Sequence, residues 1–168
     1  PLMARPQLKP PVALLVYPAG LYVARLVALL NEARVGCVIH TGDITQAATL
    51  EVLTRLDAPL VGVYGNNDVG ERAALEAASA RFDVRLSDPP HELHLAGRRI
   101  LVVHDPRALD GALDGHHVAL HGHTHRHACE RRDGALVFNP GECAGHVPGL
   151  NAVGVLDLAT LSTELLRF

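Results

Sequence analysis

The sequence has no tryptophan, one methionine, three cysteines and a single lysine among its 168 residues. The cysteines, Cys37, Cys129 and Cys143, are odd in number and widely spaced, which argues against a disulfide framework and favours reduced thiols in the cytoplasm. With Lys9 as the only lysine and a net charge of −3, the chain also lacks the dense basic stripe of proteins that bind nucleic acid nonspecifically. These scarcities favour a cytoplasmic globular protein.

Long hydrophobic runs are also missing. The most apolar stretch, residues 11–30, is interrupted by Pro18 and Gly20, whereas a membrane-spanning helix needs about 20 consecutive apolar residues. We therefore expect no membrane span, and the start of the chain has no cleavage pattern of a signal peptide. Hydrophobic residues nevertheless make up 48% of the chain, enough for one core. The expected organisation is a Pro-rich N-terminal tail at 1–11 and a single domain at 12–168.

The first half of the chain alternates short aliphatic runs with amphipathic segments of helical period. The aliphatic runs predict strands and the amphipathic segments predict helices. This βαβαβα order indicates parallel strands joined by right-handed crossovers. Thr45 is the expected N-cap of the second helix. The predicted strands occupy 12–17, 36–43 and 58–68, and the predicted helices occupy 21–33, 45–56 and 71–82.

The second half is dominated by predicted strands. Gly97 marks one hairpin turn and Asp133 with Gly134 marks another, since Asp-Gly is a strong signal of a two-residue turn. A short helix or loop is expected at 106–115. Together the two halves predict an α/β fold of two packed sheets, parallel in the first half and antiparallel in the second, with helices outside. The predicted strands and hairpins of the second half cover 91–97, 98–105, 116–122, 127–141, 151–158 and 161–168.

Polar side chains with metal-binding chemistry follow four of the predicted strands. Ligands gather beyond the carboxyl ends of strands in parallel sheets, so these loops are expected to meet at one rim. A glycine precedes three of the polar residues and allows the chain to turn sharply. Carboxylate, amide and imidazole donors suit Mn²⁺, Fe²⁺, Zn²⁺ or Ni²⁺, and the lack of cysteine favours a catalytic over a structural site. The four groups are Thr41-Gly42-Asp43, Gly65-Asn66-Asn67-Asp68, His104-Asp105 and Gly122-His123-Thr124-His125.

In order and spacing, these motifs resemble the calcineurin-like metallophosphoesterase superfamily, and more closely its small single-domain bacterial and archaeal phosphodiesterases. The resemblance implies an α/β fold, a four-layer αββα sandwich of two mixed β-sheets flanked by helices. It also implies a metal-dependent phosphoric ester hydrolase, a phosphodiesterase rather than a phosphomonoesterase. One or two divalent ions are implied, with Mn²⁺ favoured over Ni²⁺, Fe²⁺ or Zn²⁺. The matching segments are VIHTGDI (38–44), VYGNND (63–68), LVVHD (101–105), HGHTH (121–125) and FNPGE (138–142).

The resemblance implies a role for each matched residue. Asp43 would bridge both ions. Asn66, His104 and His123 would complete the shell of one ion, and His125 would bind the other. Asn67 takes the position of a histidine thought to protonate the leaving group in some relatives, so this amide would hydrogen-bond phosphate instead. Asp68 would orient its neighbours. The implied metal ligands are Asp43, Asn66, His104, His123 and His125, and the implied catalytic residues are Asn67, Asp68 and His125.

One family motif, Asp-x-His after the first strand, is missing. Residues 17–20 read Tyr-Pro-Ala-Gly, and no Asp or His precedes Asn31. This motif supplies two ligands of the ion that His125 would bind. Because they are absent, the site is expected to hold only the other ion firmly. With one ion, a phosphodiester is an easier substrate than a monoester because it carries a single negative charge. His125 would then serve as a general acid or base.

Four further side chains near the motifs receive other roles. His121 and His127 are expected to pack or to face solvent, and His40 is expected in the core or beside the ligands. His146 lies beyond the Asn-Pro-Gly-Glu loop, where it could face the site. Asp105 is interpreted as a loop carboxylate rather than as a substitute ligand.

Two alternatives stay open at this point. A chain that has lost the first motif could be a catalytically degenerate scaffold for protein-protein binding, as the retromer subunit of this fold is, or a small metal-binding sensor without turnover. The expected partner of an enzyme is a small phosphate-ester substrate, with no membrane involved. Nucleic acid is expected only as a small nucleotide substrate, because aromatic residues make up just 4% of the chain. The sequence leaves a homo-oligomer open.

Overall fold

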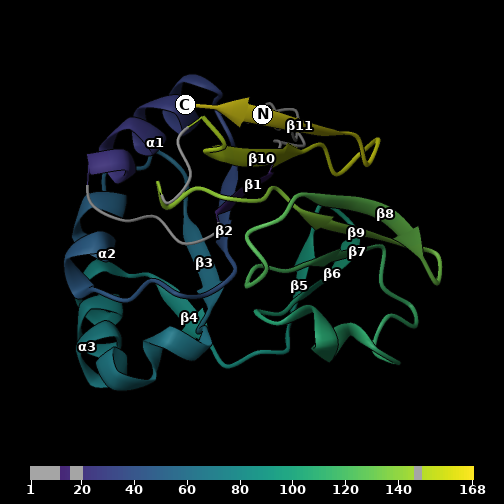
Figure 1. The fold of residues 1–168 in the computed structure, drawn as a ribbon, viewed down its shortest axis with the longest axis horizontal. Coiled ribbons are helices and arrows are strands. Elements are labelled where there is room, and N and C mark those ends of the chain that lie inside the picture. Colours follow the sequence, from purple (N-terminus) through teal and green to yellow (C-terminus); the bar gives the residue numbers. More distant parts are fainter. Residues whose placement is uncertain (1–11, 16–20, 146–148) are drawn as a thin grey trace, which may run out of the picture.

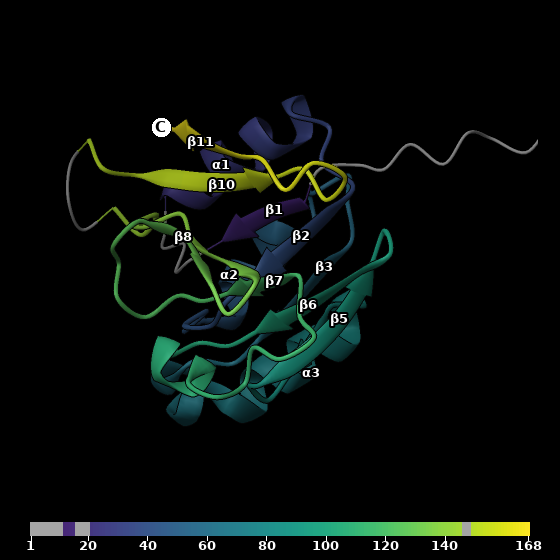
Figure 2. The same cartoon turned by 90° about the vertical axis from the view of Figure 1, so that its right-hand side faces the viewer.

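The structure, a computed structural model, describes residues 12–15, 21–145 and 149–168. Two β-sheets pack face to face, and three helices cover the outer face of the first sheet (Figure 1). Figure 2 shows the second sheet turned toward the viewer. The predicted α/β fold of two mixed sheets flanked by helices is confirmed. Among the described residues, no helix combines the length and apolar character that a bilayer crossing requires.

The first sheet has six described strands. Strands β1 to β4 run parallel because a helix connects each to the next, and β10 and β11 add an antiparallel edge. The helices are α1 (Leu21–Glu32), α2 (Ala47–Leu53) and α3 (Arg72–Phe82). In order along the sheet, the strands are β11 (Thr163–Arg167), β10 (Ala152–Leu156), β1 (Val12–Leu15), β2 (Cys37–His40), β3 (Leu60–Val63) and β4 (Arg85–Ser87).

The prediction of antiparallel strands in the second half is wrong for the centre of the second sheet. There β6 pairs with β7, and β7 with β9, in parallel, while the hairpins β5-β6 and β8-β9 are antiparallel. The 3₁₀ helix η2 (Pro106–Leu109) lies in the crossover from β6 to β7. Strand β8 follows β7 in the chain but lies at the edge of the sheet, beside β9. In order along the sheet, the strands are β5 (His91–Leu95), β6 (Arg98–Val102), β7 (Val118–Leu120), β9 (Ala135–Asn139) and β8 (Ala128–Arg132).

Two local expectations also need correction. Thr45 is not the N-cap of α2; that position belongs to Gln46. Thr45 has a φ of 62°, and its backbone N–H donates to Oδ1 of Asp68 at 2.7 Å, so it belongs to the preceding loop. Strand β4 was not predicted, because three partly exposed residues are too short to show a period. The predicted tail at 1–11 lies outside the described residues, and the domain limits stay a prediction.

Apolar residues fill the space on both sides of the first sheet. One cluster packs the helices against that sheet and includes Leu26, Leu30, Leu50, Leu53 and Leu75. A second lies between the two sheets and includes Ile39, Val63, Ile100, Leu120 and Phe138. A third, smaller cluster covers the outer face of the second sheet with Leu109 and Leu113. The fourth layer of the sandwich is therefore formed by η2 and the loop that follows it.

Phe138 provides the test of packing between the sheets. Its ring is fully buried and rests on Gly154, where an added Cβ would lie 2.4 Å from Cε1 of the ring. We expect Phe138→Ala to lower the free energy of unfolding by about 3–5 kcal/mol, measured by urea denaturation, because a cavity remains between the sheets. The control Leu150→Ala, at a side chain that is 52% exposed, should cost less than about 1 kcal/mol. Equal losses for the two variants would contradict this description of the core.

Candidate metal centre

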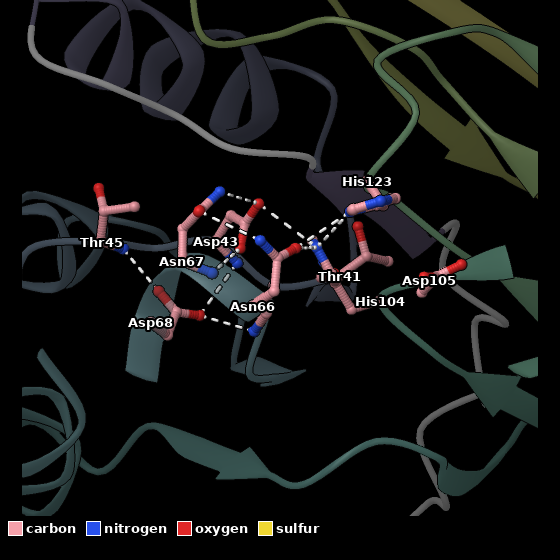
Figure 3. Close-up of polar contacts among 12 residues, drawn as sticks. Thr41, Asp43, Thr45, Asn66, Asn67, Asp68, His104, Asp105 and His123 are labelled. Atoms are coloured by element: carbon pink, nitrogen blue, oxygen red, sulfur yellow. Dashed lines mark hydrogen bonds and ion pairs between the residues drawn. The ribbon is translucent and has the colours of Figure 1, made fainter. Parts of the chain in front are cut away.

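Four side chains with metal-binding chemistry meet at one edge of the two sheets (Figure 3). Asp43 and Asn66 follow β2 and β3 of the first sheet, whereas His104 and His123 follow β6 and β7 of the second. Each of these two strand pairs is parallel, so both members of a pair end at the same edge. The four loops thus meet at one rim.

The donor atoms of these four side chains, which we call the donor cluster, lie close together. Nε2 of His104 is 2.8 Å from Oδ1 of Asn66 and 3.3 Å from Oδ2 of Asp43. The same atom is 3.2 Å from Nδ1 of His123. Oδ1 of Asn66 lies 3.0 Å from that Nδ1 atom. Nε2 of His104 therefore lies within 3.3 Å of a donor atom from each of the other three side chains.

The spacing within the donor cluster matches that of ligands around a single ion. Octahedral ligands at about 2.1 Å from an ion lie about 3.0 Å from their neighbours. The separations in the donor cluster, 2.8–3.3 Å, fall around this value. Within the part of the chain that the structure describes, no group of three His, Cys, Asp or Glu side chains could hold an ion by itself. The amide oxygen of Asn66 contacts both histidines.

Hydrogen bonds orient His104 as a metal ligand requires. Its Nδ1–H donates to the carbonyl oxygen of Thr41 at 2.8 Å, so Nε2 faces the oxygens of Asp43 and Asn66. These oxygens offer no hydrogen, so Nε2 needs a proton or a cation. Burial lowers the pKa of His104, but its bonds to Asp43 and Thr41 outweigh burial and raise the pKa. Burial likewise raises the pKa of Asp43, but hydrogen bonds from His104 and Asn67 hold it below its usual value.

A buried carboxylate ties together the two loops of the first sheet. Asp68 is 1% exposed, and its Oδ2 accepts the backbone N–H groups of Asp43 at 3.0 Å and Gly65 at 2.7 Å. Its Oδ1 accepts the N–H of Thr45 at 2.7 Å. The carboxylate is thus engaged with backbone beneath the loops, an arrangement that suits orienting Asp43 better than contacting a ligand.

The loops of the site contain strained backbone. Asp43, Thr45, His123 and His125 have φ values between 55° and 63°, in the left-handed region. Residues other than glycine rarely adopt this region, at a cost of about 1–3 kcal/mol each. Strain at several positions of two neighbouring loops is typical of functional sites.

The three glycines that precede donor residues act in two ways. Gly42 has a φ of 99°, which provides the predicted sharp turn. An added Cβ at Gly65 would lie 2.1 Å from Oδ1 of Asp43, and one at Gly122 would lie 2.8 Å from Oγ1 of Thr41. These two glycines therefore allow the loops to approach each other, a role in packing that sequence alone did not indicate.

The second histidine of the Gly-His-Thr-His motif pairs with a different partner. Within the described residues, Nδ1 of His125 contacts Oε2 of Glu142 at 2.5 Å rather than joining the donor cluster. Glu142 is buried, and its Oε1 accepts the N–H of Ala144 at 2.8 Å. Asn139 anchors this loop by donating to the carbonyl of Gly122 at 3.1 Å. The loop thus lies beside the Gly-His-Thr-His segment, but nothing in the sequence indicated a pair formed across 17 residues.

Other candidate side chains lie where the sequence analysis placed them, within the limits of the described ranges. His121 is buried, whereas His127 is exposed and packs edge-on against the ring of Phe138. Asp105 is a loop carboxylate that caps η2 by accepting the N–H of Arg107 at 2.9 Å. The hydrogen bond from the Arg107 guanidinium lowers the pKa of Asp105 to about 2.

Two positions of interest lie outside the described residues. One is His146, which was expected beyond the Asn-Pro-Gly-Glu loop, where it could face the site. The other is the loop at 17–20, where the Asp-x-His motif is missing.

The sequence is similar to a phosphoesterase family and to a phosphodiesterase. The family model of the calcineurin-like phosphoesterase superfamily domain matches residues 20–161. A phosphodiesterase of Methanocaldococcus jannaschii is 30% identical over 140 residues, which cover 80% of this chain and 84% of that protein.

Solved structures show the same fold. An archaeal phosphodiesterase superposes with a TM-score of 0.86 at 25% identity, and the match covers 94% of this chain and 99% of that one. An E. coli phosphoesterase matches with a TM-score of 0.65 at 18% identity, covering 93% of this chain and 97% of that one. A variant of Vps29 from Entamoeba histolytica has a TM-score of 0.65 at 17% identity, with 94% and 99% covered. The last two likenesses show the fold alone.

His40 lies on β2 directly before the loop that carries Asp43. It is fully buried, and its Nδ1 accepts the N–H of Gly42 at 3.1 Å, so the proton of the neutral ring is on Nε2. Among the residues that the structure describes, Nε2 has no hydrogen-bond partner. Burial lowers the pKa of His40 to about 3.

We expect the metal-free protein to lose stability as the pH falls from 6.5 toward 3. The unfolded chain protonates His40 below pH 6.5, whereas the folded chain keeps it neutral down to about 3, so acid favours unfolding. His40→Asn, whose amide oxygen can accept the same N–H, should flatten this dependence by a few kcal/mol in urea denaturation with EDTA. His127→Asn, at an exposed ring, is the control. The same pH dependence in wild type and His40→Asn would show the assignment to be wrong.

Proposed function

This chain belongs to the calcineurin-like phosphoesterase superfamily, and on that premise we propose that it is a metal-dependent phosphodiesterase. Phosphoesterase function follows from the family and from the 30% identical phosphodiesterase. The observation that carries the finer proposal is the convergence of the donor cluster around Nε2 of His104, at 2.8–3.3 Å.

The donor cluster would hold one divalent ion through two oxygen and two nitrogen atoms. Mn²⁺ is the ion we propose, and Ni²⁺, Fe²⁺ and Zn²⁺ are others that such a mixed set accepts. A divalent ion bound there would polarise a phosphoryl oxygen and lower the pKa of a water molecule. Thr41 supports the site by accepting the Nδ1–H of His104, as an outer partner of a ligating histidine usually does.

We assign His125 to proton transfer. The Asp-x-His motif that would complete a second ion site is missing from the sequence, and Nδ1 of His125 is held by the carboxylate of Glu142. A carboxylate in that position fixes the orientation of the ring, which suits a side chain that transfers a proton. If a second ion binds, His125 would be its ligand together with Asp43.

Asn67 and Asp68 have separate roles in this proposal. The backbone N–H of Asn67 donates to Oδ1 of Asp43 at 2.9 Å, and its Nδ2 donates to Oδ2 of the same carboxylate at 2.9 Å. Nδ2 therefore lies at the margin of the donor cluster, where it can donate to a phosphate oxygen. Asp68 remains beneath, where its three backbone contacts keep Asp43 in position.

Charge favours a diester as the substrate. A phosphomonoester carries more negative charge than a diester and needs more positive charge around it. Arg72, which lines the same cleft as Asn66 and His104, is already paired with Asp88 and Glu76, and Arg107 is paired with Asp105. A substrate with one negative charge fits these surroundings better than one with two.

The amide oxygen of Asn66 should decide whether an ion binds. We expect Asn66→Leu to lower Mn²⁺ affinity by at least about tenfold, because a ligand atom is lost, whereas Asn66→Asp keeps an oxygen at the position. Isothermal titration calorimetry measures the affinity, and circular dichroism shows that the variants are folded. Equal Mn²⁺ affinity in wild type and Asn66→Leu would remove Asn66 from the site.

Hydrolysis of bis(p-nitrophenyl) phosphate with Mn²⁺ tests the activity itself. The double substitution Asp43→Ala and His123→Ala should lower kcat/KM by about 100-fold or more, because it removes two of four donors. The exposed His127→Ala, outside the donor cluster, should behave as wild type. Unchanged hydrolysis in the double variant would end the proposal.

A further inference from the structure

A cleft of about 330 Å³ opens beside the donor cluster. Its volume is at the small end of the range of about 300–1,000 Å³ for small-molecule sites. Asn66 and His104 belong to both the donor cluster and the lining of the cleft. The rest of the lining comes from the segment around the 3₁₀ helix η1 (Asn66–Glu71), from the turn before β5, and from η2. The side chains used below are Tyr64, Val69, Pro89 and Ala108.

The lining away from the donor cluster presents apolar surface. Val69 is 77% exposed, against 39% for Tyr22 and 52% for Leu150, the other large hydrophobic side chains exposed in the described residues. A single exposed apolar side chain is ordinary on a surface. Val69, however, shares with Pro89 and Ala108 a cleft that leads to the donor cluster. Apolar lining next to a few convergent polar groups is typical of a ligand site.

The charged groups of the cleft are paired. Cζ of Arg72 lies 3.6 Å from the centre of the Tyr64 ring, and the guanidinium binds Asp88 at 2.6 Å and Glu76 at 2.6 Å. Stacking and two ion pairs fix this guanidinium and compensate its charge. Asp105 is likewise held in an ion pair. Among the residues described, the cleft therefore offers a fixed apolar surface and no uncompensated cation for a second phosphate.

We propose that this cleft binds an uncharged aryl substituent of a phosphodiester, and that Val69 and Ala108 determine this specificity. The inference rests on the proposed function, because it takes the phosphate to lie at the donor cluster. A phosphate placed beside Asn66 and His104 directs one of its two ester substituents into the cleft that these residues share.

The chemistry of the lining selects between substituents. An aryl ring would lose its contact with water against the apolar side chains of Val69 and Pro89, a gain that a methyl group cannot match. An anionic substituent, such as a further phosphate, would find no uncompensated cation among the described residues of the cleft, because Arg72 is paired with Asp88 and Glu76. The cleft therefore favours an aryl ester over both an alkyl ester and a polyphosphate.

Two stable diester analogues test the proposal without catalysis. Methyl phenylphosphonate and methyl methylphosphonate carry the same single charge and differ only in the aryl group. In the presence of Mn²⁺, calorimetry should show that the wild-type protein binds the phenyl compound at least about tenfold more tightly. Equal affinities for the two compounds would overturn the proposal.

Substitutions in the cleft give a second readout. Val69→Asn, which makes the wall polar, and Ala108→Leu, which fills space, should each weaken binding of the phenyl compound by about fivefold or more. Binding of the methyl compound should change by less than about twofold. Ala77→Leu makes the same change at an exposed alanine of α3, in a different groove, and serves as the control. Unchanged binding of the phenyl compound in both cleft variants would overturn the proposal.

The activity assay separates this inference from the proposed function. If the protein hydrolyses bis(p-nitrophenyl) phosphate, the cleft variants should raise KM and leave kcat nearly unchanged, since the contact is the same in substrate and transition state. Hydrolysis without selectivity for the phenyl compound would overturn the cleft assignment alone. Selective binding of the phenyl compound without hydrolysis of any diester would support the cleft and overturn the proposed function.

Discussion

The site depends on one buried carboxylate. Asp68 accepts backbone N–H groups from both loops of the first sheet, at Asp43, Thr45 and Gly65. Two of these residues, Asp43 and Thr45, have left-handed φ values that would not persist without such support. The carboxylate thus holds the strained turn that positions the Asp43 side chain, and it joins this turn to the loop that carries Asn66. Asp68 itself takes no part in the proposed chemistry. Its hydrogen bonds to the backbone position the loops whose side chains do.

Much of the fold could be predicted because its elements carry local signals. Helices α1, α2 and α3 show helical period, and Asp133 with Gly134 marks the turn of the β8-β9 hairpin. Parallel pairing of β6, β7 and β9 could not be predicted, since it depends on which strands meet after the chain crosses over. Thr45 shows a related limit. Threonine favours the N-cap position, but the backbone N–H of Thr45 donates to Asp68, so Thr45 belongs to the loop before the helix.

The candidate site was partly visible in the sequence for a chemical reason. Side chains that bind metals at strand ends, preceded by glycine, are few, so Asp43, Asn66 and His123 could be selected without a structure. The partners that adjust these groups could not. The carbonyl of Thr41 behind His104 belongs to the backbone, and the pair of Glu142 with His125 joins two separate loops. The cleft also escapes sequence analysis, because its walls come from segments that carry no shared pattern.

The short helix η2 has an evolutionary consequence. Leu109 is 1% exposed and packs in the cluster on the outer face of the second sheet, whereas its neighbour Ala108 faces outward into the cleft. Adjacent positions of a single turn thus separate folding from recognition. Substitutions at Ala108 should change the free energy of unfolding little, because its side chain is not part of the core. Descendants of this chain can therefore differ in the compounds they bind while they keep the same fold.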